Sequence, residues 1–183
     1  MNYKNYSSEG FVIGRKNFSE ADRIVVFYTK DFGKVSLIAK GVRKLTSRKR
    51  GGIEIFSKIK FSAVKTNGLD ILTEVSVIDG YDEVRANLRR ISIGYYICEV
   101  IAKVTRDNET HLEIFQLMER YFEELKTNRN LKVLRGKFVT ELLVVLGFWP
   151  EGKKMTDPDS VLESVVERKI NSSRVGKKML QQN

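Results

Sequence analysis

The stretch ADRIVVFYTKDFGKVSLIAKG, residues 21–41, decides how the first half of this chain folds. Its first run sends successive side chains to opposite faces: Ile24, Val26 and Tyr28 to one, Val25, Phe27 and Thr29 to the other. A period of two is typical of a β-strand, and Asp31-Phe32-Gly33 supplies a turn before the second run. The stretch therefore predicts two half-buried antiparallel strands joined by a turn.

Further runs of this kind lie on both sides of that pair. We expect five strands, at about residues 9–15, 22–30, 33–40, 56–66 and 69–79. Asn67-Gly68 joins the last two, and this dipeptide is typical of a type I′ hairpin turn. Because closure removes exposed strand edges, five short strands favour an oligonucleotide/oligosaccharide-binding (OB) barrel, with an SH3-like barrel or small sandwich as alternatives.

The hydrophobic period changes at about residue 80. Beyond it, apolar residues recur every three or four positions, which is typical of amphipathic helices. The three predicted stripes are Leu88, Ile91, Tyr95, Cys98 and Ile101; Leu112, Phe115, Met118, Phe122 and Leu125; and Leu131, Leu134, Phe138, Leu142 and Val145. Asp157-Pro158 then fits the cap and first position of a shorter helix that we expect to end near residue 169.

These patterns predict an α+β protein. We expect a five-stranded OB-fold domain at residues 1–80, an all-α helical domain at 81–170 and a polar tail at 171–183. The start of the chain has no apolar signal segment, and no stretch approaches the roughly 18 apolar residues of a membrane span. The sequence therefore predicts a cytosolic protein that does not act at a membrane.

Several kinds of chemistry lack their usual residues. The 183 residues include one cysteine, Cys98, and one histidine, His111, which excludes an internal disulfide and a Cys/His zinc cluster. Glu20 and Asp22 stand beside Arg23 without a third ligand, so we interpret them as ion-pairing or turn-capping residues. We expect no catalytic residue, no metal and no cofactor, and Cys98 is predicted to be a buried structural thiol.

Positive charge is concentrated in the strand-rich half. The chain holds 33 Lys and Arg against 23 Asp and Glu, and residues 1–80 hold 15 against 8. The segment 40–50 contains six of these cations, and no carboxylate occurs from Phe32 through Ile53. Phosphate oxygens accept Arg and Lys donors, and neutralising them releases counterions, so the segment predicts nucleic-acid binding. A merely solvated charged loop is the alternative. The candidate residues are Lys40, Arg43, Lys44, Arg48, Lys49 and Arg50.

The predicted fourth strand extends this candidate site. Lys58 and Lys60 stand two residues apart and so project from the same face of a strand. Aromatic rings next to such cations can stack on unpaired bases. Phe32 is the best candidate because it lies in a turn, whereas most other aromatic residues are needed inside a small barrel.

The sequence also resembles a known family. EGFVIGRKNFSEADRIVVFYTKDFGKVSLIAKGVRKLTSRKRGG at 9–52, IFSKIKF, LDILTEVSVID and LLVVLGFWP closely resemble the bacterial recombination mediator RecO. The motifs E-x-D-R-I-V, A-K-G-x-R and S-R occur in the order found in that family, and the likeness spans roughly residues 8–150. The resemblance implies an OB fold followed by a helical domain, and a cytoplasmic, nucleoid-associated protein of DNA repair and recombination.

The resemblance further implies a function without catalysis. Members bind single- and double-stranded DNA, anneal complementary strands, engage the acidic C-terminal tail of the single-stranded-DNA-binding protein, and work with RecR to load the recombinase RecA. Lys40, Arg43 and Arg48 match the family's motifs, and Arg135 and Lys137 are the nearest counterparts for binding the acidic tail. Many members carry a four-cysteine zinc module after the GFWP segment, and its cysteines are absent here, so we expect a zinc-free, shortened C-terminal part.

Two other functions remain open from sequence. An RNA- or ribosome-binding OB module fits the same charge pattern, and an RNA preference would require contacts sensitive to the 2′-hydroxyl. A metal-dependent nuclease is the second alternative, although its ligand cluster is missing.

Overall fold

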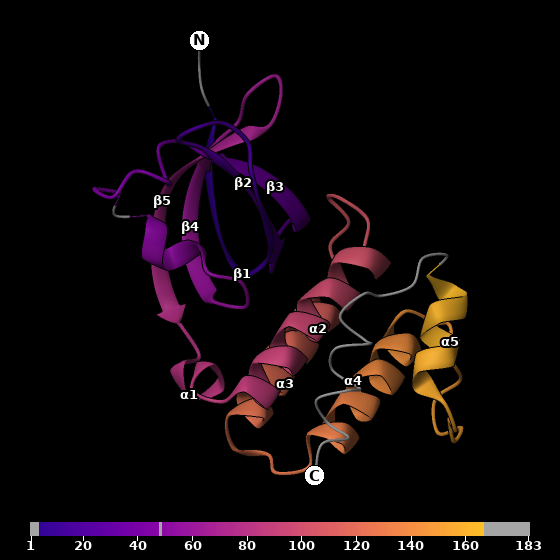
Figure 1. Cartoon of the computed structure of the whole chain (residues 1–183). Helices are drawn as coiled ribbons and strands as arrows, with labels where there is room; N and C mark the ends of the chain where they lie inside the picture. Colours follow the sequence, from indigo (N-terminus) through magenta and orange to yellow (C-terminus); the bar gives the residue numbers. More distant parts are fainter. Residues whose placement is uncertain (1–3, 48, 167–183) are drawn as a thin grey trace. The chain divides into compact units, whose positions relative to one another are not determined.

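Five strands form the first part of the chain, as the sequence predicts (Figure 1). The computed structural model describes residues 4–47 and 49–166, so Arg48 and the predicted polar tail lie outside the described residues. The strands are β1 (Asn5–Asn17), β2 (Arg23–Thr29), β3 (Gly33–Ala39), β4 (Lys58–Val64) and β5 (Asp70–Asp79). They close into a barrel in the order β1-β2-β3-β5-β4, in which only the β3–β5 pair is parallel. The predicted OB-like α+β fold is confirmed.

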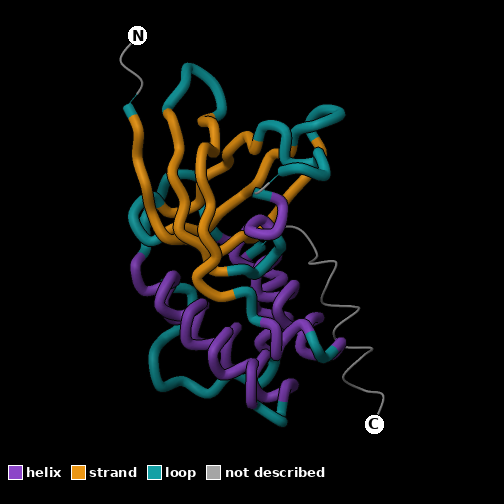
Figure 2. Tube along the Cα trace, turned by 90° about the vertical axis from the view of Figure 1, so that its left-hand side faces the viewer, coloured by secondary structure: helices purple, strands orange, loops and turns teal. Residues whose placement is uncertain are grey.

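The barrel interior is filled by alternate residues of its strands, which curve around it in Figure 2. On β4, Ile59, Phe61 and Ala63 are buried while Lys60 is exposed, as the period of two predicts. The rings of Phe27 and Phe61 stack inside the barrel with their centroids 5.1 Å apart. The inward-facing set is Val12, Val25, Phe27, Val35, Leu37, Ala39, Val42, Ile53, Ile59, Phe61, Ala63 and Leu72.

Strand β2 departs from the predicted half-buried pattern because both of its faces are covered. Val25 and Phe27 point into the barrel, yet Ile24 and Tyr28 on the other face are buried too. The Tyr28 hydroxyl donates a hydrogen bond to the carbonyl of His111, in a distant segment that packs on this strand. Alternation alone does not reveal such a cover, so the prediction of a solvated face was wrong for β2.

The β4–β5 hairpin is confirmed, but its predicted type I′ turn is wrong. That turn needs a positive φ at both central residues, and neither Asn67 nor Gly68 has one. A five-residue loop follows Val64 instead, in which the Asp70 carboxylate accepts a hydrogen bond from the Thr66 amide at 2.9 Å. The Asp70 side chain thus provides a hydrogen-bond acceptor for a backbone amide of the loop, so the two strands can be joined without a two-residue turn.

The segment between β3 and β4 is more ordered than its polar sequence suggests. Val42, Ile53 and Phe56 are fully buried, and residues Arg50–Ile53 form a short 3-10 helix, η1. Phe56, expected to open the fourth strand, has a φ of 60° and precedes the strand. Three buried anchors therefore hold the segment against the barrel.

Helices form the remainder of the described chain: α1 (Asp82–Arg85), α2 (Leu88–Val104), α3 (Leu112–Thr127), α4 (Leu131–Val145) and α5 (Pro158–Val165). Helix α5 begins as predicted, because the Asp157 side chain caps it and Pro158 occupies its first turn. The predicted stripe of α2 is partly wrong. Leu88 and Tyr95 are exposed, whereas Ile93, Ile97 and Ile101 are buried together with Cys98. Their spacing of four residues shows that the buried face of α2 is rotated from the predicted one.

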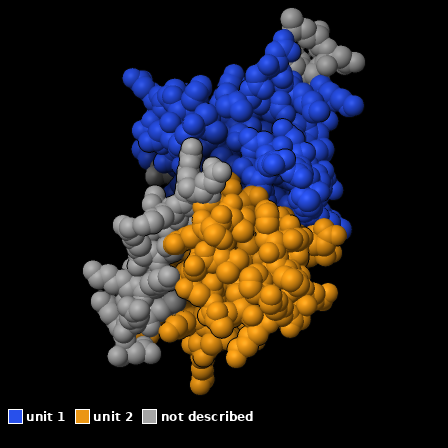
Figure 3. All heavy atoms as spheres, turned by 90° about the vertical axis from the view of Figure 1, so that its right-hand side faces the viewer, with its two compact units in different colours: residues 1–81, 105–112 blue, residues 82–104, 113–183 orange. Residues whose placement is uncertain are grey.

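The chain divides into two compact units (Figure 3). The first comprises residues 1–81 and 105–112, and the second comprises 82–104 and 113–183. Residues 105–112, which connect α2 to α3, therefore belong with the barrel. Lys34 on β3 donates to the carbonyl of Thr105 at 2.6 Å, and the Asn108 amide donates to the carbonyl of Lys34 at 2.9 Å.

We expect Gly33→Ala to destabilise the barrel unit. Gly33 has a φ of 63°, and a Cβ built on it would lie 2.0 Å from the Glu109 carbonyl oxygen. The left-handed backbone alone costs an alanine roughly 1–2 kcal/mol, and the clash adds to this. Urea unfolding followed by circular dichroism measures the loss. Gly41→Ala is the matched control, because Gly41 has a φ of 66° and no atom near its built Cβ. Equal losses of stability in the two variants would mean that residues 105–112 can move away from the new Cβ without lowering the free energy of unfolding.

Candidate nucleic-acid interface

The basic segment begins where β3 ends, and it is tied there to the turn between β1 and β2. The Gly41 amide donates to the Asp22 carboxylate at 2.8 Å, and the Arg43 amide donates to the Ala21 carbonyl at 3.0 Å. The Arg43 guanidinium donates to the Ser19 carbonyl at 2.7 Å. Asp22 thus has the turn-capping role expected of it. These contacts fix the first part of the segment beside the β1–β2 turn.

The cations at this end are open to solvent. Lys40, Arg43 and Lys44 are exposed, while Val42 between them is fully buried in the barrel. Within the described residues, none of these three cations forms an ion pair with a carboxylate. A buried anchor with exposed charges on both sides presents the cations outward, so they are available to an anionic ligand.

The second part of the segment lies along β5. The Lys49 ammonium donates to the Leu72 carbonyl at 3.0 Å, and a Cβ at Gly52 would come within 2.5 Å of the Val75 side chain. Gly52 has no side chain, and this allows η1 to approach β5 closely. The segment therefore reaches the strand that pairs with β4.

A groove of about 610 Å³ opens where this segment meets the outer faces of β4 and β5. It brings together Lys49, from the segment, and Lys60, from β4, which are eleven positions apart in sequence. Glu74 on β5 is its one acidic lining residue. Two ammonium groups and several hydroxyls can donate hydrogen bonds to phosphate oxygens. The remaining lining residues are Ser47, Phe61, Ser62, Thr73, Val75 and Ser76.

We call the five cations Lys40, Arg43, Lys44, Lys49 and Lys60 the basic interface. Other predicted members fall outside it. Lys58 is only half exposed and does not line the groove, although it lies on the same strand face as Lys60. Arg48 lies outside the described residues, and nothing is described for the side chain of Arg50. Their roles in binding stay predictions.

The ring of Phe32 is turned into the protein. It is half-buried, packs against the barrel core and meets the Tyr6 ring edge-on with 4.9 Å between the centroids. The Phe32 amide also donates to the Thr29 hydroxyl at 3.0 Å, which fixes the turn. Little of the ring face is left for a base, so stacking by Phe32 stays a prediction.

An aromatic residue that the sequence analysis missed is far more exposed. Phe18 lies in the β1–β2 turn with 57% of its surface accessible, next to Ser19, which binds Arg43. It sits in a polar stretch, Asn17-Phe18-Ser19-Glu20, and takes part in neither of the periodic patterns. That isolation from any hydrophobic stripe was the available signal, because an aromatic residue outside the stripes has no core position to fill.

The two candidates for binding an acidic tail differ in the structure. Lys137 on α4 is exposed, but Arg135 is only 6% exposed, so the expectation that it is available to a partner was wrong. Its guanidinium donates to the Asp159 carboxylate at 2.5 Å and lies 4.2 Å from the centre of the Tyr96 ring. Burial is the main cause that raises the pKa of Tyr96 above its ordinary value. The Tyr96 hydroxyl thus stays protonated and donates to Asp159 at 3.0 Å.

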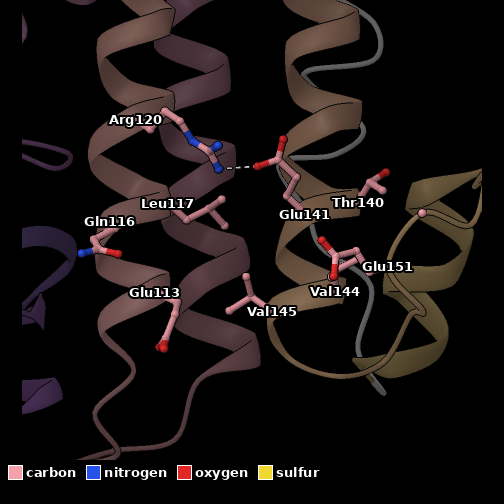
Figure 4. Close-up of a pocket in the computed structure, with 10 residues that line it drawn as sticks. Glu113, Gln116, Leu117, Arg120, Thr140, Glu141, Val144, Val145 and Glu151 are labelled. Carbon is pink, nitrogen blue, oxygen red and sulfur yellow. Dashed lines mark hydrogen bonds and ion pairs between the residues drawn. The ribbon is translucent and has the colours of Figure 1, made fainter.

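The helical unit has a groove of its own between α3 and α4, also of about 610 Å³ (Figure 4). Arg120 and Glu141 form an ion pair across it, and Leu117, Val144 and Val145 give it an apolar floor. Tyr121 donates to Glu141 at 2.8 Å, and burial together with this hydrogen bond raises the pKa of its hydroxyl. Neither Arg135 nor Lys137 lines the groove.

The structure also bears on metal binding and on membrane spans within residues 4–47 and 49–166. Among these residues, no group of three or more His, Cys, Asp or Glu side chains is placed to hold a metal ion. No helix in the same part of the chain is long and apolar enough to cross a membrane.

Comparison with known proteins agrees with the resemblance noted in the sequence. Residues 1–81 match the family model described as recombination protein O N terminal, and residues 85–156 match that described as recombination protein O C terminal. Similar curated proteins named DNA repair protein RecO include those of three bacteria. That of Listeria monocytogenes serotype 4b is 28% identical over 142 residues, which cover 78% of this chain and 56% of that protein. Those of Halalkalibacterium halodurans and Symbiobacterium thermophilum are 28% and 29% identical, covering 80% and 79% of this chain and 58% of each relative. The chain thus spans somewhat more than half the length of the relatives it matches.

Proposed function

The chain belongs to the recombination protein O family, and from this premise we propose that it binds DNA and acts as a recombination mediator without catalysis. In this proposal the barrel holds the phosphodiester backbone and the helical unit binds protein partners. The observation that carries it is the basic interface, whose cations form no ion pair with a carboxylate among the described residues and of which all but Lys49 are exposed. A surface that satisfied these charges internally would have little left to offer a polyanion.

Strand annealing follows from the same electrostatics. Two complementary strands repel each other through their phosphates, and cations placed between them lower this repulsion. Holding both strands on one protein also raises their effective concentration for pairing. No nucleophile or activated water is needed for either effect, which is why we propose a non-enzymatic role.

The proposed partners are those implied by the family. They are single- and double-stranded DNA, the acidic tail of the single-stranded-DNA-binding protein, and RecR, with loading of RecA onto coated DNA as the outcome. Exposed Lys137 remains the proposed contact for the acidic tail. An annealing assay on DNA coated with the cognate single-stranded-DNA-binding protein, with and without its acidic tail, tests both units. We expect annealing to be lost when the tail is removed, and equal rates would contradict the role of the tail.

Binding to single strands should depend steeply on salt. If six phosphates are contacted, a plot of log affinity against log salt concentration should have a slope of about −4, at about −0.7 per contact. Fluorescence anisotropy of a labelled oligonucleotide over a series of salt concentrations measures this slope. A slope close to zero would mean that phosphate neutralisation does not drive binding.

A second candidate function is RNA or ribosome binding, which the same interface would serve. Competition between DNA and RNA strands of the same sequence separates the two. We expect DNA to compete at least as well as RNA, because the described interface presents charge without an evident reader of the 2′-hydroxyl. A clear preference for RNA would favour the second function.

A further inference from the structure

We propose that Phe18 stacks on an unpaired base and gives the basic interface its preference for single-stranded over double-stranded nucleic acid. This inference rests on the proposed function, since a stacking residue needs a backbone held beside it. It adds a contact of a different kind, because the cations of the interface bind phosphates alike in paired and unpaired strands.

The first support is the position of Phe18 relative to the cations. The backbone carbonyl of its neighbour Ser19 accepts a hydrogen bond from the guanidinium of Arg43. The backbone amide of Arg43 donates a hydrogen bond to the carbonyl of Ala21 in the same turn. Arg23, at the far end of the turn, donates to the Asn17 side chain at 3.1 Å. The residues on either side of Phe18, Asn17 and Ser19, thus each accept a hydrogen bond from an arginine side chain. A strand whose phosphates meet Arg43 would bring its bases next to the ring.

The second support is that the turn is already fixed. The amides of Phe18 and Ser19 both donate to the Asp22 carbonyl, at 3.1 and 3.4 Å, and the Asp22 amide donates to the Ser19 hydroxyl at 3.1 Å. Three hydrogen bonds within five residues hold the backbone that carries the ring. A preorganised turn loses less conformational entropy on binding, so more of the stacking energy of the ring contributes to affinity.

The third support is the chemistry of the two forms of DNA. Bases in a duplex are already stacked on one another and paired, so their faces are covered. Unpaired bases offer a free face to an aromatic ring, and each such contact is typically worth ~1–3 kcal/mol. The loop between the first two strands is also one of the places where OB folds bind oligonucleotides. A ring at this point discriminates between the two forms without reading sequence.

Isolated exposed apolar side chains are common on proteins and need no function by themselves. The chain offers a matched control for this reason. Phe148, after α4 in the helical unit, is 55% exposed, against 57% for Phe18. The two rings differ in their surroundings within their own units, because Phe18 adjoins the basic interface of the barrel unit.

The test compares Phe18→Ala with Phe148→Ala in binding single-stranded and duplex oligonucleotides at one salt concentration. We expect Phe18→Ala to lose roughly 5- to 150-fold in affinity for single strands and to bind duplex as before, with its salt slope unchanged. Phe148→Ala should match the parent protein in both. Thermal unfolding of each variant checks that the fold is kept.

A spectroscopic readout makes the test direct. Trp149 is the only tryptophan of the chain, so Phe18→Trp in a Trp149→Phe background places a single fluorophore in the β1–β2 turn. Stacking on oligo(dT) should quench its fluorescence, and a duplex of equal length should not. Unchanged single-strand affinity of Phe18→Ala, or equal losses for single strands and duplex, would overturn the inference while leaving the proposed function intact. Failure of the parent protein to bind either form would overturn both.

Discussion

The variant Lys40→Glu/Lys44→Glu/Lys60→Glu is expected to lose at least roughly 100-fold in affinity for single-stranded DNA at ~0.1 M salt. Each phosphate contact adds about 0.7 to the slope of log affinity against log salt concentration. Between ~1 M and ~0.1 M salt this amounts to about 0.7 log units of affinity per contact, so the loss of three contacts lowers log affinity by about 2 at ~0.1 M salt. Reversing the charges adds repulsion to this loss. The salt slope should become shallower by about 2, which a titration by fluorescence anisotropy measures together with the affinity.

These three lysines suit the experiment because we expect their replacement to leave the fold intact. All three are exposed, and within the described residues none of their ammonium groups forms a hydrogen bond or an ion pair. Arg43 and Lys49 are left unchanged, because each donates to a backbone carbonyl of the barrel unit. Any loss of binding can then be assigned to the interface and not to unfolding.

Arg129→Glu/Lys132→Glu/Lys154→Glu is the matched control. It changes the net charge of the chain by the same amount, at three exposed positions of the helical unit. We expect less than about a threefold change in DNA affinity from it. If both triple variants lost affinity equally, binding would depend on overall charge, and the assignment of the basic interface would be wrong.

Arg135→Ala should destabilise the helical unit by about 3–5 kcal/mol. Arg135 lies on α4, and its buried pair with Asp159 on α5 has side-chain exposures of 7% and 17%. Removing the arginine takes away the guanidinium that pairs with the Asp159 carboxylate in this buried setting, and it also removes the contact with the Tyr96 ring. Urea unfolding followed by the fluorescence of Trp149, which lies in the same unit, measures the loss.

Two further variants identify the cause of that loss. Lys137→Ala changes an exposed residue of the same helix and should cost less than about 0.5 kcal/mol. The double variant Arg135→Met/Asp159→Leu replaces the whole ion pair by apolar side chains and should be more stable than Arg135→Ala, because no buried charge is left unpaired. A double variant as unstable as the single one would show that packing around Arg135, and not charge, dominates.

Sequence reasoning failed for Arg135 for an identifiable physical reason. Basic residues on a helix are usually solvated, and this general tendency outweighed the position of Arg135 three or four residues from Leu131, Phe138 and Val139, which are all buried. Its burial depends on Asp159 and Tyr96, which lie on two other helices and are brought to it only when the helices pack. The same limit applies to β2, whose second face is covered by residues more than eighty positions away.

Features that depend on residues close together in the chain could be predicted from the sequence alone. The period of two placed the five strands and the inward face of β4, Asp157-Pro158 placed the start of α5, and a run of cations without carboxylates marked the segment 40–50. Contacts between residues far apart in the chain became known from the tertiary structure. Lys49 joins Lys60 in one groove, Arg43 is bound to the turn that carries Phe18, and Arg135 is withdrawn into the helical unit. Backbone geometry fixes periodicity over a few residues, whereas such meetings depend on the packing of whole strands and helices, which local spacing does not specify.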